Sequence, residues 1–222
     1  MFVLAACAAM AVGSVQAADF STISNTDAVS ALRATLNKGA DVAVQSLGKP
    51  DGFLGNPAAR IKLPPALDSS KKMIKMVGMG DQLEQLEVSM NRAAEAAVPQ
   101  AKALLKKTIQ NMSVADARQV LGGGETAVTD FFRSKTQADL TQQLLPIVSA
   151  KTAQVGVAQQ YKALAEKGSK FGLLKPEEAN LEAYVTGKAL DGLYLMIAEE
   201  EKSIRANPAA AGAAVLKKVF GG

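Results

Sequence analysis

The hydrophobic pattern is clearest in residues 180–205, whose sequence is NLEAYVTGKALDGLYLMIAEEEKSIR. Apolar side chains recur there at helical spacing, and from Leu193 to Ala198 every residue is apolar, so this part of the helix has no polar face. Asn180 is a favourable N-cap, and Asn207-Pro208 ends the helix. The pattern predicts a helix at the centre of the fold. Its apolar run is far shorter than the roughly 20 residues of a membrane span.

Most of the remaining chain also repeats apolar residues every three or four positions. Asn25 is expected to cap the first helix, Pro99 to break or kink a later one, and capping-box patterns at 113–116 and 136–139 mark two further helix starts. No run alternates as a strand would, and no long period repeats. We therefore expect an all-α fold, a single helical bundle of about seven to nine helices around the central C-terminal helix. Besides that helix, the predicted segments are residues 25–47, 67–77, 81–97, 101–112, 113–121, 128–132, 136–168 and 215–220.

The segment between the first two helices, GKPDGFLGNPAARIKLP at residues 48–64, is rich in turn residues. It is long for a connection inside a compact domain, and such loops are either functional or simply strapped across a bundle. Both alternatives are open at this point. If the loop and the central helix enclose a groove, the loop residues expected to line it are Phe53, Leu54, Asn56 and Arg60.

Residues 1–17 are almost wholly apolar and end in the triplet VQA, which has small residues at the positions that a signal peptidase recognises. They predict a secretory signal peptide, leaving residues 18–222 as one all-α domain in the periplasm or outside the cell. A basic segment before the apolar stretch is missing, so we expect the true start codon upstream of Met1. A lipoprotein anchor at Cys7 is the alternative interpretation.

The chain has no histidine, and its single cysteine, Cys7, is lost with the predicted signal peptide. These absences exclude disulfides, thiolate nucleophiles, Ser-His-Asp triads and histidine-containing metal sites from the predicted mature domain. We therefore predict no catalytic residue, no metal site and no cofactor. The 25 basic and 21 acidic residues are spread along the chain, which does not favour a nucleic-acid partner.

Two groups of polar residues lie within otherwise apolar predicted helices, where an unpaired charge is costly. The first is Asn91, Arg92 and Glu95, and the second is Lys188 and Asp191. Their spacing brings the members of each group close together on the helix surface. We hypothesise that the two groups approach each other, either as a structural network that fixes the helix register or as a ligand-binding site.

Four segments carry a specific pattern: GKPDGFLGNPAARIKLP at 48–64, LEVSMNRAAEAAVP at 86–99, QVGVAQQY at 154–161 and YVTGKALDGLYLMIAEEEKSIRANPAA at 184–210. Together they resemble a bacterial family of exported proteins catalogued as a domain of unknown function (DUF 4197). The resemblance covers nearly all of the predicted mature chain. It implies an exported, mostly helical single domain, and it implies no activity or ligand.

The leading functional expectation is a non-enzymatic binding or structural module, with a protein or small-molecule partner held between the 48–64 loop and the central helix. One alternative is a lipid- or membrane-associated helical protein, in which the small apolar face at 215–220 makes a peripheral membrane contact. The other is an enzyme that uses carboxylate and lysine chemistry. Residues 199–201, three consecutive glutamates, are interpreted as a solvated charged face. The sequence carries no signal for a particular oligomeric state.

Overall fold

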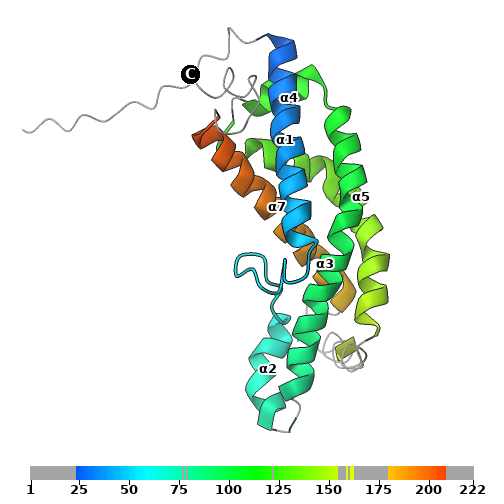
Figure 1. The fold of residues 1–222 in the computed structure, drawn as a ribbon. Helices are drawn as coiled ribbons and strands as arrows, with labels where there is room; N and C mark the ends of the chain where they lie inside the picture. Colours follow the sequence, from blue (N-terminus) through cyan, green and yellow to red (C-terminus); the bar gives the residue numbers. More distant parts are fainter. Residues whose placement is uncertain are drawn as a thin grey trace, which may run out of the picture.

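The computed structural model describes residues 24–76, 78, 80–121, 123–154, 159, 161–162 and 180–208. These residues form an all-α structure, and none of them belongs to a strand (Figure 1). The described helices are α1 (Asn25–Leu47), α2 (Pro65–Met76), α3 (Gly80–Gln110), α4 (Val114–Leu121), α5 (Ala127–Thr152) and α7 (Leu181–Ala206). The predicted fold class is therefore confirmed. The predicted signal peptide and the predicted helix at 215–220 lie outside the described residues.

α7 is the central helix that the hydrophobic pattern predicted. It packs against α1, α3 and α5 (Figure 1), and its Leu193, Tyr194 and Ile197 side chains are almost completely buried. The helix begins where the sequence indicated, because the Asn180 side chain accepts a hydrogen bond from the N–H of Ala183 at 2.9 Å. No helix among the described residues is both long enough and apolar enough to cross a membrane.

α1 approaches α7 closely because Gly39 has no side chain at their contact. A Cβ atom on Gly39 would lie 3.3 Å from Cγ2 of Ile197, closer than an ordinary van der Waals contact, so even an alanine there would require Ile197 to shift by a few tenths of an ångström. The bounds of α1 match the prediction, but the capping residue differs. The hydroxyl of Ser24, rather than the side chain of Asn25, accepts the N–H of Asp27 at 3.1 Å.

Two predicted helix boundaries are wrong, so the described helices are fewer and longer than expected. α3 continues through Pro99, and α5 continues through Thr136. A proline removes a hydrogen bond from a helix interior, but the flanking Val98 and Ala101 are fully buried, and this packing holds α3 together as one helix. Thr136 does not cap a helix start, because its hydroxyl donates within α5 to the carbonyl of Phe132 at 2.9 Å.

The capping box before α4 is confirmed. The Asp116 carboxylate accepts hydrogen bonds from the hydroxyl of Ser113 at 2.7 Å and from its N–H at 3.1 Å. In return, the Ser113 hydroxyl accepts the N–H of Asp116 at 3.1 Å. The two bonds from Ser113 favour the ionised carboxylate and hold the pKa of Asp116 below its usual value.

The 48–64 segment is ordered and leads into α2, which packs beside α3 at one end of the molecule (Figure 1). Phe53, Ile61 and Leu63 are buried, whereas Arg60 and Lys62 are exposed. From residue 59 to residue 63, buried and exposed positions alternate, as expected of extended backbone lying on a core. This segment is therefore a fixed part of the molecule, and its exposed positions are available for contacts.

Replacing Leu193 by alanine is expected to lower the free energy of unfolding by roughly 2–5 kcal/mol, because the substitution leaves a cavity in the core. Leu195→Ala is the matched control: this neighbouring side chain is only half-buried, so a loss of about 1 kcal/mol is expected. Urea unfolding followed by circular dichroism measures both. Equal losses for the two variants would contradict the central position of α7.

Candidate functional site: a groove beside the central helix

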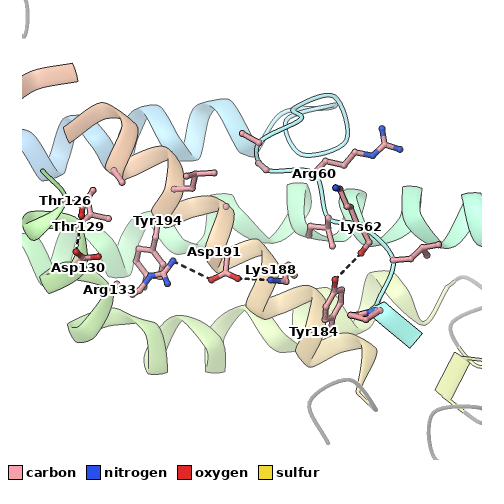
Figure 2. A pocket seen from close by; sticks show the side chains of 18 of the residues that line it. Arg60, Lys62, Thr126, Thr129, Asp130, Arg133, Tyr184, Lys188, Asp191 and Tyr194 are labelled. Carbon is pink, nitrogen blue, oxygen red and sulfur yellow. Dashed lines mark hydrogen bonds and ion pairs between the residues drawn. The ribbon is translucent and has the colours of Figure 1, made fainter. Parts of the chain in front are cut away.

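A groove of about 770 Å³ lies along α7, and three parts of the chain form its walls. These are the segment at residues 58–65, which runs from a turn through extended backbone to the start of α2, the N-terminal part of α5 with its N-cap residue, and the face of α7 that no other described helix covers (Figure 2). A volume of this size falls within the roughly 300–1,000 Å³ that is typical of ligand pockets. The groove contains both charged and apolar side chains.

The α7 wall is a single stripe of side chains along one face of the helix. Its members are Tyr184, Lys188, Asp191, Leu195 and Ala198, which are spaced by four, three, four and three residues as one helical face requires. At a rise of about 1.5 Å per residue the stripe is about 21 Å long. The N-terminal part of the stripe is polar and its C-terminal part is apolar, so this wall of the groove is charged at one end and hydrophobic at the other.

The α5 wall presents Thr126, Thr129, Asp130 and Arg133. The Arg133 guanidinium lies 4.8 Å from the centre of the Tyr194 ring and 3.5 Å from the Asp191 carboxylate. Asp191 also accepts a hydrogen bond from Lys188 at 3.2 Å, so one carboxylate is shared by two cations, as Figure 2 shows. These charged groups are about half-exposed, and their ion pairs therefore contribute little to stability.

Tyr194 forms the floor between the α5 and α7 walls. Its hydroxyl lies 2.7 Å from the hydroxyl of Thr136, which already donates to the carbonyl of Phe132, so Tyr194 is the donor in this pair. Burial is the main cause that raises the pKa of Tyr194 above its usual value, because ionising a buried phenol is unfavourable. The phenol thus joins α5 to α7 beneath the groove as a neutral hydrogen-bond donor.

The extended wall is held in place by hydrogen bonds from α3 and α7. The Asn91 side chain accepts the N–H of Ile61 at 2.9 Å and donates to the carbonyl of the same residue at 2.8 Å. It also donates to the carbonyl of Glu87, one turn earlier in α3, at 2.8 Å. From α7, the Tyr184 hydroxyl donates to the carbonyl of Lys62 at 3.2 Å (Figure 2). The backbone of this wall is therefore fixed on both sides.

Glu95 holds the preceding turn of the same segment. One oxygen of its buried carboxylate accepts the backbone N–H groups of Phe53 and Leu54 at 3.1 and 3.2 Å. The other oxygen accepts a hydrogen bond from Arg92 at 2.7 Å, and Arg92 also pairs with Asp51 at 2.8 Å. These carboxylates, Glu95 first, raise the pKa of the Arg92 guanidinium. The group predicted around Glu95 is thus a network that holds the 48–64 segment on α3.

The structure separates the residues that the sequence singled out. Those that line the groove are Arg60, Lys188 and Asp191. Those that instead position the 48–64 segment or connect it to the helices are Asn91, Arg92, Glu95, Phe53, Leu54 and Asn56. Among the described residues, no hydrogen bond or ion pair joins the Asn91–Glu95 group to the Lys188–Asp191 group.

The remaining loop residues predicted to line a groove, Phe53, Asn56 and Arg60, each contact a helix. Phe53 is fully buried over α7, and a Cβ atom on Gly192 would lie only 2.7 Å from its ring. Asn56 accepts the N–H of Ala58 at 3.1 Å and places its amide nitrogen 3.8 Å from the sulfur of Met196. Arg60 reaches Glu87 of α3 at 2.7 Å while its side chain remains 46% exposed.

Glu201 corrects the interpretation of residues 199–201 as a solvated face, because its side chain is only 1% exposed. Its carboxylate accepts the N–H groups of Val128 and Thr129 at 3.1 and 2.9 Å and the hydroxyl of Thr129 at 2.7 Å. These amides lie in the first turn of α5, where a helix has no internal acceptors. Arg205, one turn later in α7, pairs with the same carboxylate at 3.0 Å. Glu201 therefore caps α5 from another helix.

Most of the residues that line the groove were not predicted from the sequence, although the periodicity of two of its segments could have indicated them. The stripe from Tyr184 to Ala198 has helical spacing, and the alternation around Lys62 has the period of extended chain, so both were open to detection. Arg133 and Thr129 had no comparable signal, because their place in the groove depends on how α5 packs against α7.

The fold and the groove together define an all-α protein with a candidate binding site along its central helix. The chain belongs to the family described as Protein of unknown function (DUF4197), whose model matches residues 22–221. The resemblance carried by the four sequence segments is therefore confirmed. Among curated proteins and solved structures, none matches the chain.

Replacing Glu201 by alanine is expected to lower the free energy of unfolding by roughly 3–5 kcal/mol, because two buried amides in the first turn of α5 lose their acceptor and the partly buried Arg205 loses an ion pair. Asp191→Ala is the comparison: this carboxylate is 51% exposed, so a change below about 1 kcal/mol is expected. Urea unfolding at neutral pH measures both. A large loss for Asp191→Ala would show that the groove carboxylate belongs to a structural network after all.

Proposed function

We propose that the protein is an exported, non-enzymatic binding module whose ligand occupies the groove along α7. The observation that carries this proposal is the combination of an open groove with fixed walls. Asn91, Glu95 and Glu201 are buried and hold the walls by hydrogen bonds to backbone amides. The ion pairs of Asp191 with Lys188 and Arg133 at the surface of the groove are exposed. Such an arrangement is preorganised for binding, since little has to be ordered when a ligand enters.

The chemistry available at the surface of the groove supports binding better than catalysis. A catalytic lysine is usually activated by desolvation in an apolar pocket or by a neighbouring cation. The Lys188 side chain is 47% exposed and pairs with a carboxylate. Asp191 is similarly exposed and is shared with Arg133. These pairs suit recognition of charge in a ligand.

Export is part of the proposal and rests on the sequence. Residues 1–17 have the apolar character and the small terminal residues of a signal peptide. The match to the family begins at residue 22, after the proposed cleavage position. Cleavage after Ala17 leaves a domain without cysteine.

The mature N-terminus is expected to be Ala18. Terminal sequencing of the protein from the periplasmic or extracellular fraction of its own cells measures this directly. Ala17→Asp is expected to block processing, because signal peptidase requires a small residue at this position. A lipid-modified Cys7 in the membrane fraction would contradict the proposed cleavage.

A ligand that occupies the groove is expected to remain bound when the protein is exposed to the small-molecule and peptide fraction of the same compartment. Native mass spectrometry should then detect an additional mass on the wild-type protein. Ala198→Tyr, which places a ring in the groove, should lose that mass. Val88→Tyr is the matched control, since Val88 is exposed on α3 and does not line the groove.

Two results would contradict the proposal. One is a wild-type protein that retains no additional mass. The other is a retained mass that Ala198→Tyr leaves unchanged, because the ligand would then bind elsewhere.

A further inference from the structure

We infer that the groove binds a short, extended peptide segment that carries a carboxylate near Lys62 and Lys188 and an apolar side chain over Leu195 and Ala198. This inference rests on the proposed function and specifies its ligand. Shape, charge and the distribution of apolar surface each support it.

The shape of the groove favours an elongated ligand. The α7 stripe from Tyr184 to Ala198 is about 21 Å long, and all five of its side chains line the groove. An extended chain advances about 3.3 Å per residue, so about six residues would follow the stripe from end to end. The opposite wall, residues 58–65, includes extended backbone and borders the same space (Figure 2).

The charges in the groove favour a negatively charged ligand. Among the lining carboxylates, Asp68 and Asp130 lie in the first turns of α2 and α5, where the positive end of each helix dipole compensates them. The third carboxylate, Asp191, is shared between Lys188 and Arg133. One carboxylate for two cations leaves a surplus of positive charge in the middle of the groove.

The extended wall adds another cation. The ammonium group of Lys62 has no ion-pair partner among the described residues. Because Tyr184 bonds to the Lys62 backbone, this residue is fixed opposite the polar half of the α7 stripe (Figure 2). The extended wall thus adds a cation without an internal partner to the positive charge of the α7 wall.

The other end of the groove favours an apolar side chain. Leu195 and Ala198 are half-buried and line the groove without a covering helix among the described residues. A compact anion such as phosphate has no amide site here, because Glu201 already occupies the free N–H groups of Val128 and Thr129. The bound segment thus needs a carboxylate and an apolar group separated along its length.

A peptide fits these walls better than a fatty acid. Charged groups of both signs lie along the groove, from Asp68 and Arg60 to Asp130. A hydrocarbon chain would remove water from these charges without offering hydrogen bonds in return, which is unfavourable. A peptide backbone offers both donors and acceptors at every residue.

The test is selection from a random hexapeptide library displayed on phage, with the purified protein as the target and the Ala198→Tyr variant for counter-selection. Enriched sequences are expected to carry an excess of aspartate and glutamate, with an apolar residue several positions from the acidic one. The most enriched hexapeptide is then synthesised with capped ends, and its dissociation constant is measured by isothermal titration calorimetry.

Single substitutions then test which charged residues of the groove contact the acidic group of the hexapeptide. Lys188→Gln and Lys62→Gln should each weaken binding of this hexapeptide by about two- to fivefold, the range for losing one exposed ion pair. Asp191→Asn should tighten binding by a similar factor of about two to five, because it frees Lys188 and Arg133 from their internal competitor. Lys202→Gln and Glu199→Gln are the matched controls, since they form another exposed i,i+3 pair on α7 outside the groove. They should leave the dissociation constant unchanged.

Three outcomes would overturn the inference. Enrichment of basic hexapeptides, or weaker binding by Asp191→Asn, would reverse the assigned charge. Equal effects of Lys202→Gln and Lys188→Gln would place the binding outside the groove. Failure to enrich any hexapeptide would exclude the peptide. In that case a mass retained by the wild-type protein but not by Ala198→Tyr would preserve the proposed function, and stoichiometric binding of dodecanoate would identify an amphiphile instead.

Discussion

The structure depends on two buried carboxylates that accept backbone amides from other parts of the chain. Glu95 of α3 binds two consecutive N–H groups in the 48–64 segment, and Glu201 of α7 binds two in the first turn of α5. Each is neutralised by an arginine of its own helix, Arg92 or Arg205, about one turn away. The two groove walls that face α7 are therefore each attached through a charge-assisted hydrogen-bond network. Without these contacts the bundle could retain its core, but the groove would lose its fixed walls.

An apolar residue in place of Glu95 or Glu201 could fill the same space, and replacing buried ion pairs by apolar groups is often neutral for stability. It could not, however, accept the amides. The first-turn amides of α5 have no acceptor within their own helix, and the side chain of Thr126 does not cap them. The carboxylate of Glu201 supplies that acceptor and also sets the position of α5 along α7. We interpret the buried glutamates as determinants of where the walls lie, with Glu201→Ala as the variant that measures their contribution to stability.

The features that could be predicted from the sequence are those that depend on interactions between residues close together in the chain. The ends of α7 and the start of α4 depend on residues within one turn, Asn180 and the Ser113–Asp116 pair, and both predictions were correct. Of the break or kink expected at Pro99, the break was wrong, because burial of the neighbouring side chains outweighs one missing hydrogen bond. Glu201 was misread because its amide partners are 72 and 73 residues away in sequence. Its spacing of four and three residues from the buried Ile197 and Ile204 was the local signal that places it on the buried face of α7.

The groove itself follows from a feature of α7 that the sequence showed but did not explain. An apolar run on every side of a helix predicts complete burial, yet Leu195 and Ala198 remain only half-buried. They continue the face that carries Lys188 and Asp191, so the uncovered stripe is apolar at one end and charged at the other. A sphere-like ligand could contact only one of these ends. Because both ends lie on one rigid helix, a ligand that uses the whole stripe must be elongated and must carry its charge and its apolar group at a fixed separation.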